Sequence, residues 1–427
     1  MADAPPRRRR SPTLLALAAL VVGLGLGIAA DRTGAPALTS LVRVLEPLGA
    51  LWIAAIRMTL VPLVVALLVR AVAGFDDVRS LGRLGARTAL LFVALLVGVS
   101  LFAALVAPPL FARMPLDADT AAALRASFAP PGEEAPPLPT LRGFVTGLVP
   151  VNPVKAAADG AMLPLIVFTL LFAVATTRLA PAAKASILGL FGAVADAMLV
   201  VVRWILALTP LGVLGLTAAL GMEHGAGLVG PVAWYVAVTC GMLAACTLLL
   251  YVVAAWAGGV SLRTFARAAA PAQAMAIASR SSLASLPALI EGARRAYGDR
   301  PAITGFVLPL CVATFKITTP IADLVAPLFL ARLYGLELGW LQVATMTLVT
   351  IPLSFSNPGI PSGGLFVVSA PVLLAVGLPL DGLALLVAAD ALPDIGNTVG
   401  NVTGDMVVAT ILAREAPLAD GAATPLG

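Results

Sequence analysis

The sequence predicts an all-α polytopic membrane protein, and three observations support this fold class. Of its 427 residues, 60% are hydrophobic and only 11% are charged, whereas a soluble protein of this length exposes far more charge. Apolar runs of about 20 residues, long enough to cross a bilayer, recur along the chain. These runs are continuous rather than alternating, which excludes a transmembrane β-barrel. The net charge of +5 resides mainly in short flanks of the runs, so it does not indicate a nucleic-acid partner.

The first half of the chain contains six predicted spans after a basic N-terminus. Four arginines, Arg7 to Arg10, precede the first apolar run. A cleavable signal peptide has the same order, but no clear small-residue cleavage site precedes the next span. We therefore expect a first membrane helix whose N-terminus is cytoplasmic. The six spans are predicted at 13–30, 49–74, 88–111, 148–177, 186–221 and 228–257.

Basic residues in alternate connections predict the orientation. They follow the second, fourth and sixth spans, which satisfies the positive-inside rule and places both termini in the cytoplasm. The connection 112–147 then lies on the opposite side, where its proline-rich, weakly acidic sequence predicts irregular structure. The tail after Arg414 is short and polar. The basic residues are Arg79, Arg83, Arg87, Arg178, Lys184, Arg263 and Arg267.

After residue 260 the spans are interrupted. Residues 268–291 contain the serine cluster SRSSLASLP, and 303–331 form a span interrupted by a polar centre around Lys316 and Pro320. Residues 341–377 are broken by SFSNPGIPSGG, and 380–413 form a last span. Irregular backbone at membrane depth is tolerated only where protein or a cavity surrounds it. Paired interruptions of this kind point to a binding site near the midplane.

The last predicted span carries a polar stripe. At about 100° per residue, six polar side chains fall within an arc of roughly 100°. Each ionised group at bilayer depth costs at least about 2.5–3.5 kcal/mol, so the stripe has to meet cations, water or polar partners. It is either a site for a cation and a small molecule or a structural seam between helices. The six are Asp390, Asp394, Asn397, Thr398, Asn401 and Asp405.

Two basic side chains are candidates to face this stripe. Arg280 begins the serine cluster, and Lys316 lies in the middle of a span; a purely structural ion pair is the alternative for each. The hydroxyls of Ser281, Ser282 and Ser285 either cap a helix at a hairpin tip or bind a carboxylate there together with backbone N–H groups.

The cysteines and the histidine predict no metal or redox centre. The cysteines lie within apolar segments without paired spacing, which is typical of small core residues. One histidine in a glycine-flanked turn cannot build a metal cluster by itself. These residues are Cys240, Cys246, Cys311 and His224.

Over nearly its whole length the chain resembles the dicarboxylate/amino acid:cation symporters, the glutamate-transporter family. The most specific match is DALPDIGNTVGNVTGD at 390–405. The resemblance implies eight transmembrane helices, two re-entrant hairpins and inverted repeats. It also implies a homotrimer in the lipid of a bacterial inner membrane, working as a symporter by an elevator mechanism. The other matching stretches are IRMTLVPLV (56–64), VPVNPVKAAADGAMLP (149–164), SRSSLASLP (279–287) and GIPSGG (359–364).

The resemblance also implies a division of the chain. Residues 1–12 are a basic cytoplasmic N-terminus, and 414–427 are the tail. A scaffold that makes the trimer comprises 13–77 and 148–222. A transport domain comprises 88–111 and 228–413.

By the same resemblance, functional roles carry over onto individual residues. The α-carboxylate of an amino acid is expected at Ser282, Thr398 and Asn401, and its amino group at Asp394 beside Arg280. Sodium ligands are expected at Asn401 and Asp405. The substrate set is Arg280, Ser281, Ser282, Gly359, Pro361, Gly363, Asp394, Asn397, Thr398 and Asn401. The coupling set is Lys316, Thr318, Asp390, Asn401 and Asp405.

The cation positions depart from the family pattern. Where the family has Asn-Met-Asp-Gly, this chain has Phe-Lys-Ile-Thr at 315–318, and the stretch 90–98, aligned with three hydroxyl-bearing sodium ligands, has no hydroxyl. Sodium needs several oxygen ligands, as hard cations do. We therefore expect weak or absent sodium coupling, with the Lys316 ammonium replacing the ion and pairing with Asp405. Proton coupling through Lys316 or a buried aspartate is the further possibility.

A second departure concerns the substrate. Asn397 stands where acidic-substrate members carry an arginine, and an asparagine supplies neither the charge nor the fork that grips a carboxylate. A neutral amino acid is therefore favoured over a dicarboxylate, unless Arg280 or Lys316 compensates.

Two other functional classes remain as alternatives. The altered cation motifs also fit a transport-inactive relative that acts as a sensor or an ion-conducting channel. An intramembrane enzyme with a Ser281–Lys316 pair is conceivable, but carboxylate binding explains the serine cluster better. No Walker motif suggests ATP coupling. We expect no enzymatic activity and no cofactor other than a coupling Na⁺ or H⁺.

Overall fold

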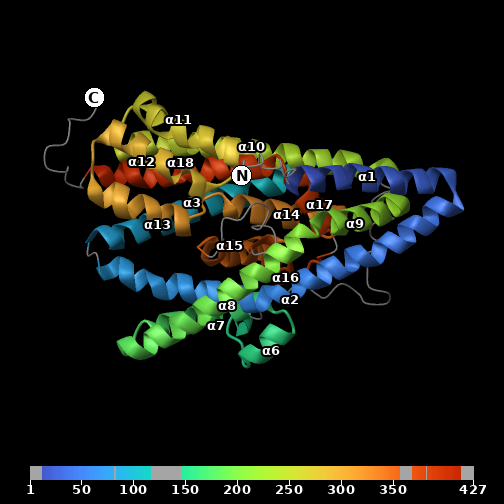
Figure 1. Ribbon diagram of the computed structural model, residues 1–427, viewed down its shortest axis with the longest axis horizontal. Helices are drawn as coiled ribbons and strands as arrows, with labels where there is room; N and C mark the ends of the chain where they lie inside the picture. The colour runs from blue at the N-terminus through green and yellow to red at the C-terminus, as the bar shows by residue number, and fades with distance from the viewer. Residues whose placement is uncertain (1–11, 81–82, 117–145, 356–367, 381, 415–427) are drawn as a thin grey trace, which may run out of the picture.

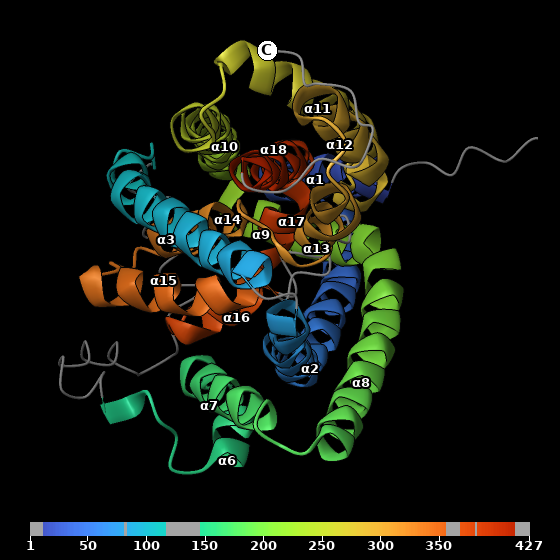
Figure 2. The ribbon, with the colours of Figure 1, turned by 90° about the vertical axis from the view of Figure 1, so that its left-hand side faces the viewer.

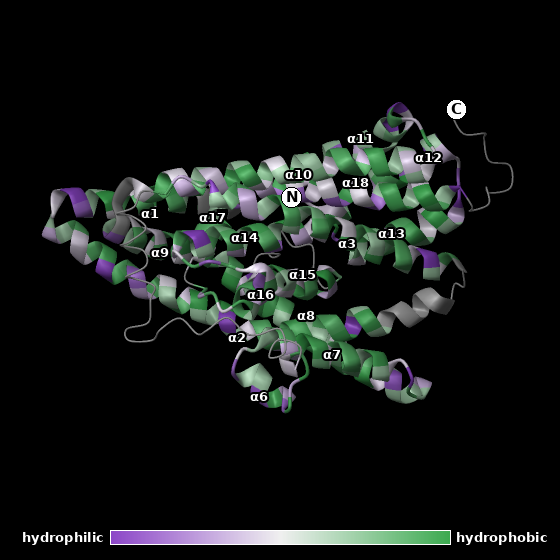
Figure 3. Ribbon diagram, turned by 180° about the vertical axis from the view of Figure 1, so that it is seen from behind, coloured by the Kyte–Doolittle hydropathy of each residue, from purple (hydrophilic) through white to green (hydrophobic). Residues whose placement is uncertain are grey.

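The computed structural model describes residues 12–80, 83–116, 146–355, 368–380 and 382–414, and the regular structure in these ranges is helical (Figure 1). Hydrophobic residues follow most of the long helices, while hydrophilic residues gather near helix ends (Figure 3). Five stretches are long and apolar enough to cross a membrane, and one bent helix pair would be a sixth. This agrees with the predicted membrane protein, while the count of eight and the re-entrant paths stay predictions. The five are Pro36–Ala73, Leu84–Ala112, Pro181–Ala207, Val229–Gly258 and Ile303–Leu333.

In the first half of the chain, α1 and α2 pack along α9, and α2 also contacts other helices. Helix α1 runs along α9, and α2 contacts α7, α8 and α9. Glycines make the α1–α9 approach possible, because a Cβ on Gly27 would lie only 2.2 Å from the Ala218 carbonyl oxygen. The bounds are α1 Pro12–Thr33, α2 Pro36–Ser80, α6 Pro153–Ala158, α7 Met162–Thr176, α8 Pro181–Ala207 and α9 Thr209–His224.

Two predicted spans of this half are wrong as continuous helices. The span 186–221 is divided at Leu208 into α8 and α9, where Pro210 lacks the N–H that would continue the hydrogen-bond ladder. The span 148–177 is divided into the short helices α6 and α7. Gly160, at φ +70°, follows α6 and allows the chain to turn there.

Helices of the second half surround α18. In the end-on view α18 lies between α10, α11, α12 and α3 (Figure 2). Fifteen of its 21 residues are buried, so its polar side chains face protein rather than lipid. The bounds are α3 Arg83–Ala112, α10 Val229–Gly258, α11 Leu262–Ser279, α12 Ser282–Tyr297, α13 Leu308–Thr314, α14 Thr319–Leu333, α15 Trp340–Ser354, α16 Ala370–Ala375, α17 Leu383–Ala389 and α18 Pro393–Ala413.

Two predicted interruptions are confirmed. Helices α11 and α12 meet at Arg280 and Ser281, within the serine cluster. Helices α13 and α14 are separated by the non-helical residues 315–318, which include Lys316. The tip of the second predicted hairpin, with Gly359, Pro361 and Gly363, lies outside the described residues.

The last predicted span, 380–413, is wrong as a single helix. It consists of α17 and α18, which are bent by 70° relative to each other. Pro393 causes the break, because it has no N–H for the Ala389 carbonyl and disfavours helical geometry at Leu392. Asp390 is the C-cap of α17, so it does not continue the polar stripe of α18. That stripe begins at Asp394.

Candidate functional site

The site is built on the polar face of α18. Thr398 and Asn401 are 6% and 8% exposed, and Asp405 is completely buried. Asp394 lies in the first turn, where the positive end of the helix dipole favours a carboxylate. The sequence predicted that these polar side chains are enclosed by protein, and their burial agrees with this.

The non-helical residues 315–318 lie directly against this face. A Cβ on Gly400 would be 2.4 Å from the Thr318 methyl group, and a Cβ on Gly404 would be 2.7 Å from a methyl of Ile317. The two glycines therefore allow the broken segment to approach the helix axis. This closeness brings polar groups of both elements within hydrogen-bonding distance.

Thr318 bonds the amide of Asn401. Its backbone N–H donates to Asn401 Oδ1 at 3.1 Å, and its hydroxyl lies 3.0 Å from the same oxygen and 3.2 Å from the Asn397 carbonyl. An amide oxygen has two lone pairs, so these two donors leave little capacity for a sodium ion on Oδ1. What Asn401 can still offer a ligand is its NH₂ group.

Lys316 and Asp405 are both buried in this region. The Lys316 side chain is 2% exposed, and its ammonium donates to the Val312 carbonyl at 2.5 Å, near the end of α13. Neither carboxylate oxygen of Asp405 has a hydrogen-bond partner among the described residues. The two groups are electrostatic neighbours. The Lys316 ammonium makes its hydrogen bond to a helix-terminal carbonyl and not to Asp405, and the replacement of a cation by Lys316 stays a prediction.

The two departures from the family pattern meet in space. Phe92 of α3 and Phe315 stack with ring centroids 4.4 Å apart and planes 8° apart. Both rings are completely buried, as is Ile317. Apolar packing thus fills a region in which the resemblance expected oxygen ligands. Among the described residues, no group of three or more His, Cys, Asp or Glu residues could hold a metal ion.

The first hairpin turn places a charge beside α18. Arg280 has φ 50°, a left-handed conformation rare for a residue with a side chain. From this position its guanidinium forms an ion pair with Asp394, at 3.8 Å between Nη1 and Oδ2. Both side chains are mostly buried, with 20% and 14% exposed. Asp390 lies within electrostatic range of both, although it belongs to the α17 end.

The serines of this turn divide into two groups. Ser281 is the N-cap of α12, with its oxygen accepting from the Ala284 N–H at 3.3 Å, and Ser285 donates to the Ser281 carbonyl. Ser281 therefore caps the helix, the first alternative considered for these serines, whereas Ser285 bonds back to a carbonyl of the same first turn. Ser282 is 7% exposed and makes no hydrogen bond through its hydroxyl within the described part of the chain. Its hydroxyl is available to a ligand.

Sequence reasoning missed Asp323. This carboxylate of α14 is 1% exposed and accepts hydrogen bonds from Thr350 of α15 and from Ser369, just before α16, the latter at 2.7 Å. It therefore joins α14 to the segments on both sides of 356–367. A lone acid within the apolar run 321–331 was the signal that could have found it.

A hydrogen-bond chain that the sequence did not predict also reaches α18. Tyr251 of α10 donates to Gln273 of α11, and Gln273 donates to Thr403 of α18 at 2.8 Å. The chain fixes the first arm of the serine hairpin to the core helix below the Arg280 turn.

A buried helix whose polar face meets a hairpin turn and a broken helix, within an apolar bundle, is an arrangement typical of membrane transporters. Comparison with known proteins specifies the class further. The chain belongs to the sodium:dicarboxylate symporter family, whose family model matches residues 13–415. The resemblance seen in the sequence motifs is thereby confirmed.

Individual relatives match over most of their length. The proton/glutamate-aspartate symporter of Escherichia coli (strain K12) is 30% identical over 380 residues, which cover 87% of this chain and 85% of the relative. The proton/sodium-glutamate symport protein of Bacillus subtilis (strain 168) is 28% identical, covering 92% and 91%. The C4-dicarboxylate transport protein of Pseudomonas fluorescens (strain SBW25) is 28% identical, covering 93% and 87%.

Proposed function

We propose that this protein is a secondary active symporter that moves an amino acid or a small dicarboxylate across the bacterial inner membrane. Family membership and the named relatives support the general activity. The observation that carries the proposal is the polar face of α18, buried at the meeting point of two helix breaks. A neutral amino acid is the favoured substrate, and an elevator movement of the second-half helices is the favoured mechanism.

A bound amino acid would have a partner for each end. Its carboxylate would accept from Ser282, from the first-turn N–H groups of α12, and from the Asn401 NH₂ group that Thr318 leaves available. Its ammonium would lie against the Asp394 carboxylate, which also forms the 3.8 Å ion pair with Arg280. Thr398 donates to the Asp394 carbonyl at 2.9 Å, so its oxygen can still accept a bond from the ligand.

Asn397 favours a neutral substrate side chain. Its Oδ1 is buried and has no hydrogen-bond partner among the described residues. A buried amide without a partner is costly, and a substrate with a hydroxyl or amide would satisfy it. The Asn397 amide is uncharged, so it cannot balance the side-chain carboxylate of an acidic substrate. The named relatives transport acidic substrates, so the alternative is that Arg280 supplies the missing charge; Lys316 is less suited because its ammonium is bonded to Val312.

The packing around 315–318 favours coupling without sodium. The Phe92–Phe315 stack and Ile317 offer no oxygen, and Asn401 Oδ1 already accepts two bonds. The Lys316 ammonium would supply, near Asp405, the positive charge that a bound sodium ion supplies only while it is bound. A proton is then the favoured coupling ion, carried by Asp405 or by Asp323. Protonation of Asp323 would alter its bonds to Thr350 and Ser369, and thereby the contact of α14 with its neighbours.

A second copy of the chain is proposed to cover α8. Arg70 and Asp196 form an ion pair of 3.2 Å between α2 and α8, yet their side chains are 56% and 71% exposed. Asp196 lies in the middle of a helix apolar enough to cross a membrane. Charges at that depth face protein or water rather than lipid. This supports the homotrimer and the scaffold role of the first-half helices.

Uptake into proteoliposomes tests the function. We expect saturable counterflow of serine or alanine, and net uptake that is driven by an inward proton gradient and is unchanged when choline replaces sodium. Strict sodium dependence would refute the coupling proposal, and absence of any counterflow would favour a sensor or channel. Asn397→Arg should shift the preference towards aspartate. Tight aspartate binding by the wild type that is lost in Arg280→Ala would instead support compensation by Arg280.

A further inference from the structure

One buried carboxylate of the second half joins three segments of the chain. Asp323 lies in α14 and is 1% exposed. It accepts hydrogen bonds from Thr350, near the end of α15, and from Ser369, which directly precedes α16, the latter at 2.7 Å between Oγ and Oδ1. Both donors are also buried. Because a carboxylate accepts several hydrogen bonds at once, this residue holds α15 and Ser369 against α14.

The same end of α14 is bonded to the candidate site. Thr318 is the N-cap of α14, and its backbone N–H donates to Asn401 Oδ1 at 3.1 Å. Asp323 follows Thr318 by five residues, so the two lie only about 7.5 Å apart along the helix axis. The position of α15 and Ser369 relative to α18 is therefore set through about one and a half turns of helix.

An aromatic contact also brings the end of α15 to the candidate site. Phe355 is the C-cap of α15, and its ring centroid lies 6.4 Å from that of Phe92 in α3. Phe92 in turn stacks on Phe315, which belongs to the non-helical residues 315–318 beside α18. A displacement of α15 would therefore reach the segment that bonds Asn401.

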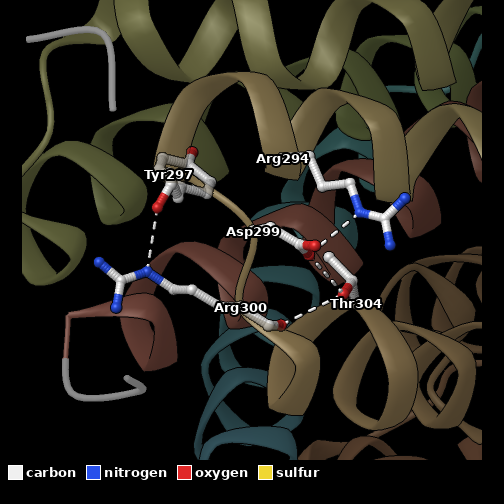
Figure 4. Close-up of polar contacts among 5 residues, drawn as sticks. All are labelled: Arg294, Tyr297, Asp299, Arg300 and Thr304. Atoms are coloured by element: carbon white, nitrogen blue, oxygen red, sulfur yellow. Dashed lines mark hydrogen bonds and ion pairs between the residues drawn. The ribbon is translucent and has the colours of Figure 1, made fainter. Parts of the chain in front are cut away.

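A similar arrangement at the surface shows what burial adds. Asp299 follows α12, and its Oδ1 accepts from Arg294 Nε at 3.1 Å and from the Thr304 hydroxyl at 3.5 Å (Figure 4). The Arg294 and Asp299 side chains are 50% and 42% exposed, so water competes for these bonds and screens the charges. Asp323 is buried, so removal of its donors would leave a carboxylate that water does not satisfy.

We propose that Asp323 is a positioning residue for the transported substrate. By holding α15 and Ser369 on α14, it fixes both relative to the polar face of α18, and it thereby sets the affinity for the amino acid. The inference rests on the proposed transport function, and it is independent of the identity of the coupling ion.

The test compares two double variants of the full-length protein in proteoliposomes, with serine as the probe. Thr350→Val/Ser369→Ala removes both donors to Asp323. Thr345→Val/Ser354→Ala is the matched control, because these buried hydroxyls bond only carbonyls of their own helix. We expect the first variant to raise the KM of serine counterflow about tenfold at a similar maximal rate, and the control to keep the wild-type KM. Counterflow is an exchange that needs no ion gradient, so a role of Asp323 in coupling does not enter.

A triple variant separates positioning from stability. The first double variant leaves a buried carboxylate without donors, which should lower the melting temperature. Asp323→Leu/Thr350→Val/Ser369→Ala also removes the carboxylate and should recover most of the loss. Its KM should nevertheless stay raised, because apolar contacts are not directional and do not hold α15 in one place. Thr350→Ser keeps the donor and should keep a KM close to that of the wild type.

The proposal is overturned by an unchanged KM in Thr350→Val/Ser369→Ala, by an equal rise in the control, or by recovery of KM together with the melting temperature in the triple variant. Hydrogen–deuterium exchange of α15 and α16 provides a readout without substrate. It should be faster in the first double variant and unchanged in the control. A wild type without saturable counterflow would contradict the proposed function, and the exchange rates would then still show whether Asp323 holds these segments.

Discussion

The α1–α9 contact and the contact of α18 with residues 315–318 both depend on glycines, but the two contacts bring different chemical groups together. In both, glycines remove side chains so that two backbone segments touch. Between α1 and α9 the surfaces that meet are backbone and small side chains. Against α18 they are amide, hydroxyl and carboxylate groups, and some of these have no hydrogen-bond partner among the described residues. The first contact is complete in itself, whereas the second is where the proposed substrate would bind.

The largest expected effect concerns the complete contact. Gly27→Ala would bring a Cβ within 2.2 Å of a backbone oxygen of α9, which cannot move without shifting the helix. Overpacking of this kind should cost about 3 kcal/mol or more and reduce the yield of folded protein on size-exclusion chromatography. Gly25→Ala, in the same helix with nothing within 4 Å of the new Cβ, should behave as wild type; a similar loss in both would disprove the role of close packing.

The next effect concerns the buried charges beside α18. Lys316→Met or Asp405→Asn leaves the other charge buried without its counter-charge and should cost roughly 3 kcal/mol in unfolding free energy. The double variant should recover most of this loss, as measured by a thermal or detergent unfolding cycle. The exposed pair Lys155 and Asp159 serves as control and should show no coupling. Additive losses at Lys316 and Asp405 would mean that the two charges act separately.

A smaller effect is expected at Gly400, where α18 meets the side chain of Thr318. Gly400→Ala would press on the Thr318 methyl group at 2.4 Å, a side chain that can give way. We expect the folded protein to persist and counterflow to fall about tenfold, which corresponds to about 1.4 kcal/mol. Gly305→Ala, which meets no atom within 4 Å, is the control. Unchanged counterflow in Gly400→Ala would separate this contact from function.

The smallest effect isolates one hydrogen bond. Thr318→Val removes the hydroxyl but keeps the backbone N–H on Asn401 Oδ1, so the cost should be about 1 kcal/mol. Thr314→Val, whose hydroxyl bonds only the Leu310 carbonyl of its own helix, should cost less. Differential scanning fluorimetry of both variants measures the difference, and a larger loss at Thr314 would contradict this account.

The sequence predicted two of the three helix breaks around the site and missed the third. The break at Arg280 and the break at Lys316 were visible because polar residues and proline interrupt apolar runs. The break between α17 and α18 was missed, although Pro393 marks it, because the polar residues on both sides fit one helical period. Asp323 was missed because its partners Thr350 and Ser369 are distant in sequence. The Lys316–Val312 bond depends on a rotamer, and no residue pattern reveals that choice.

Arg280 illustrates what such placement demands of a chain. A residue with a side chain at φ 50° carries a conformational cost of about 1 kcal/mol or more that glycine would avoid. Arg280→Gly would relieve this cost, but it would also remove the guanidinium that pairs with the mostly buried Asp394 carboxylate, so we expect a lower melting temperature. The strained backbone is therefore retained because the charge that it places beside Asp394 stabilises the fold by more than the strain costs.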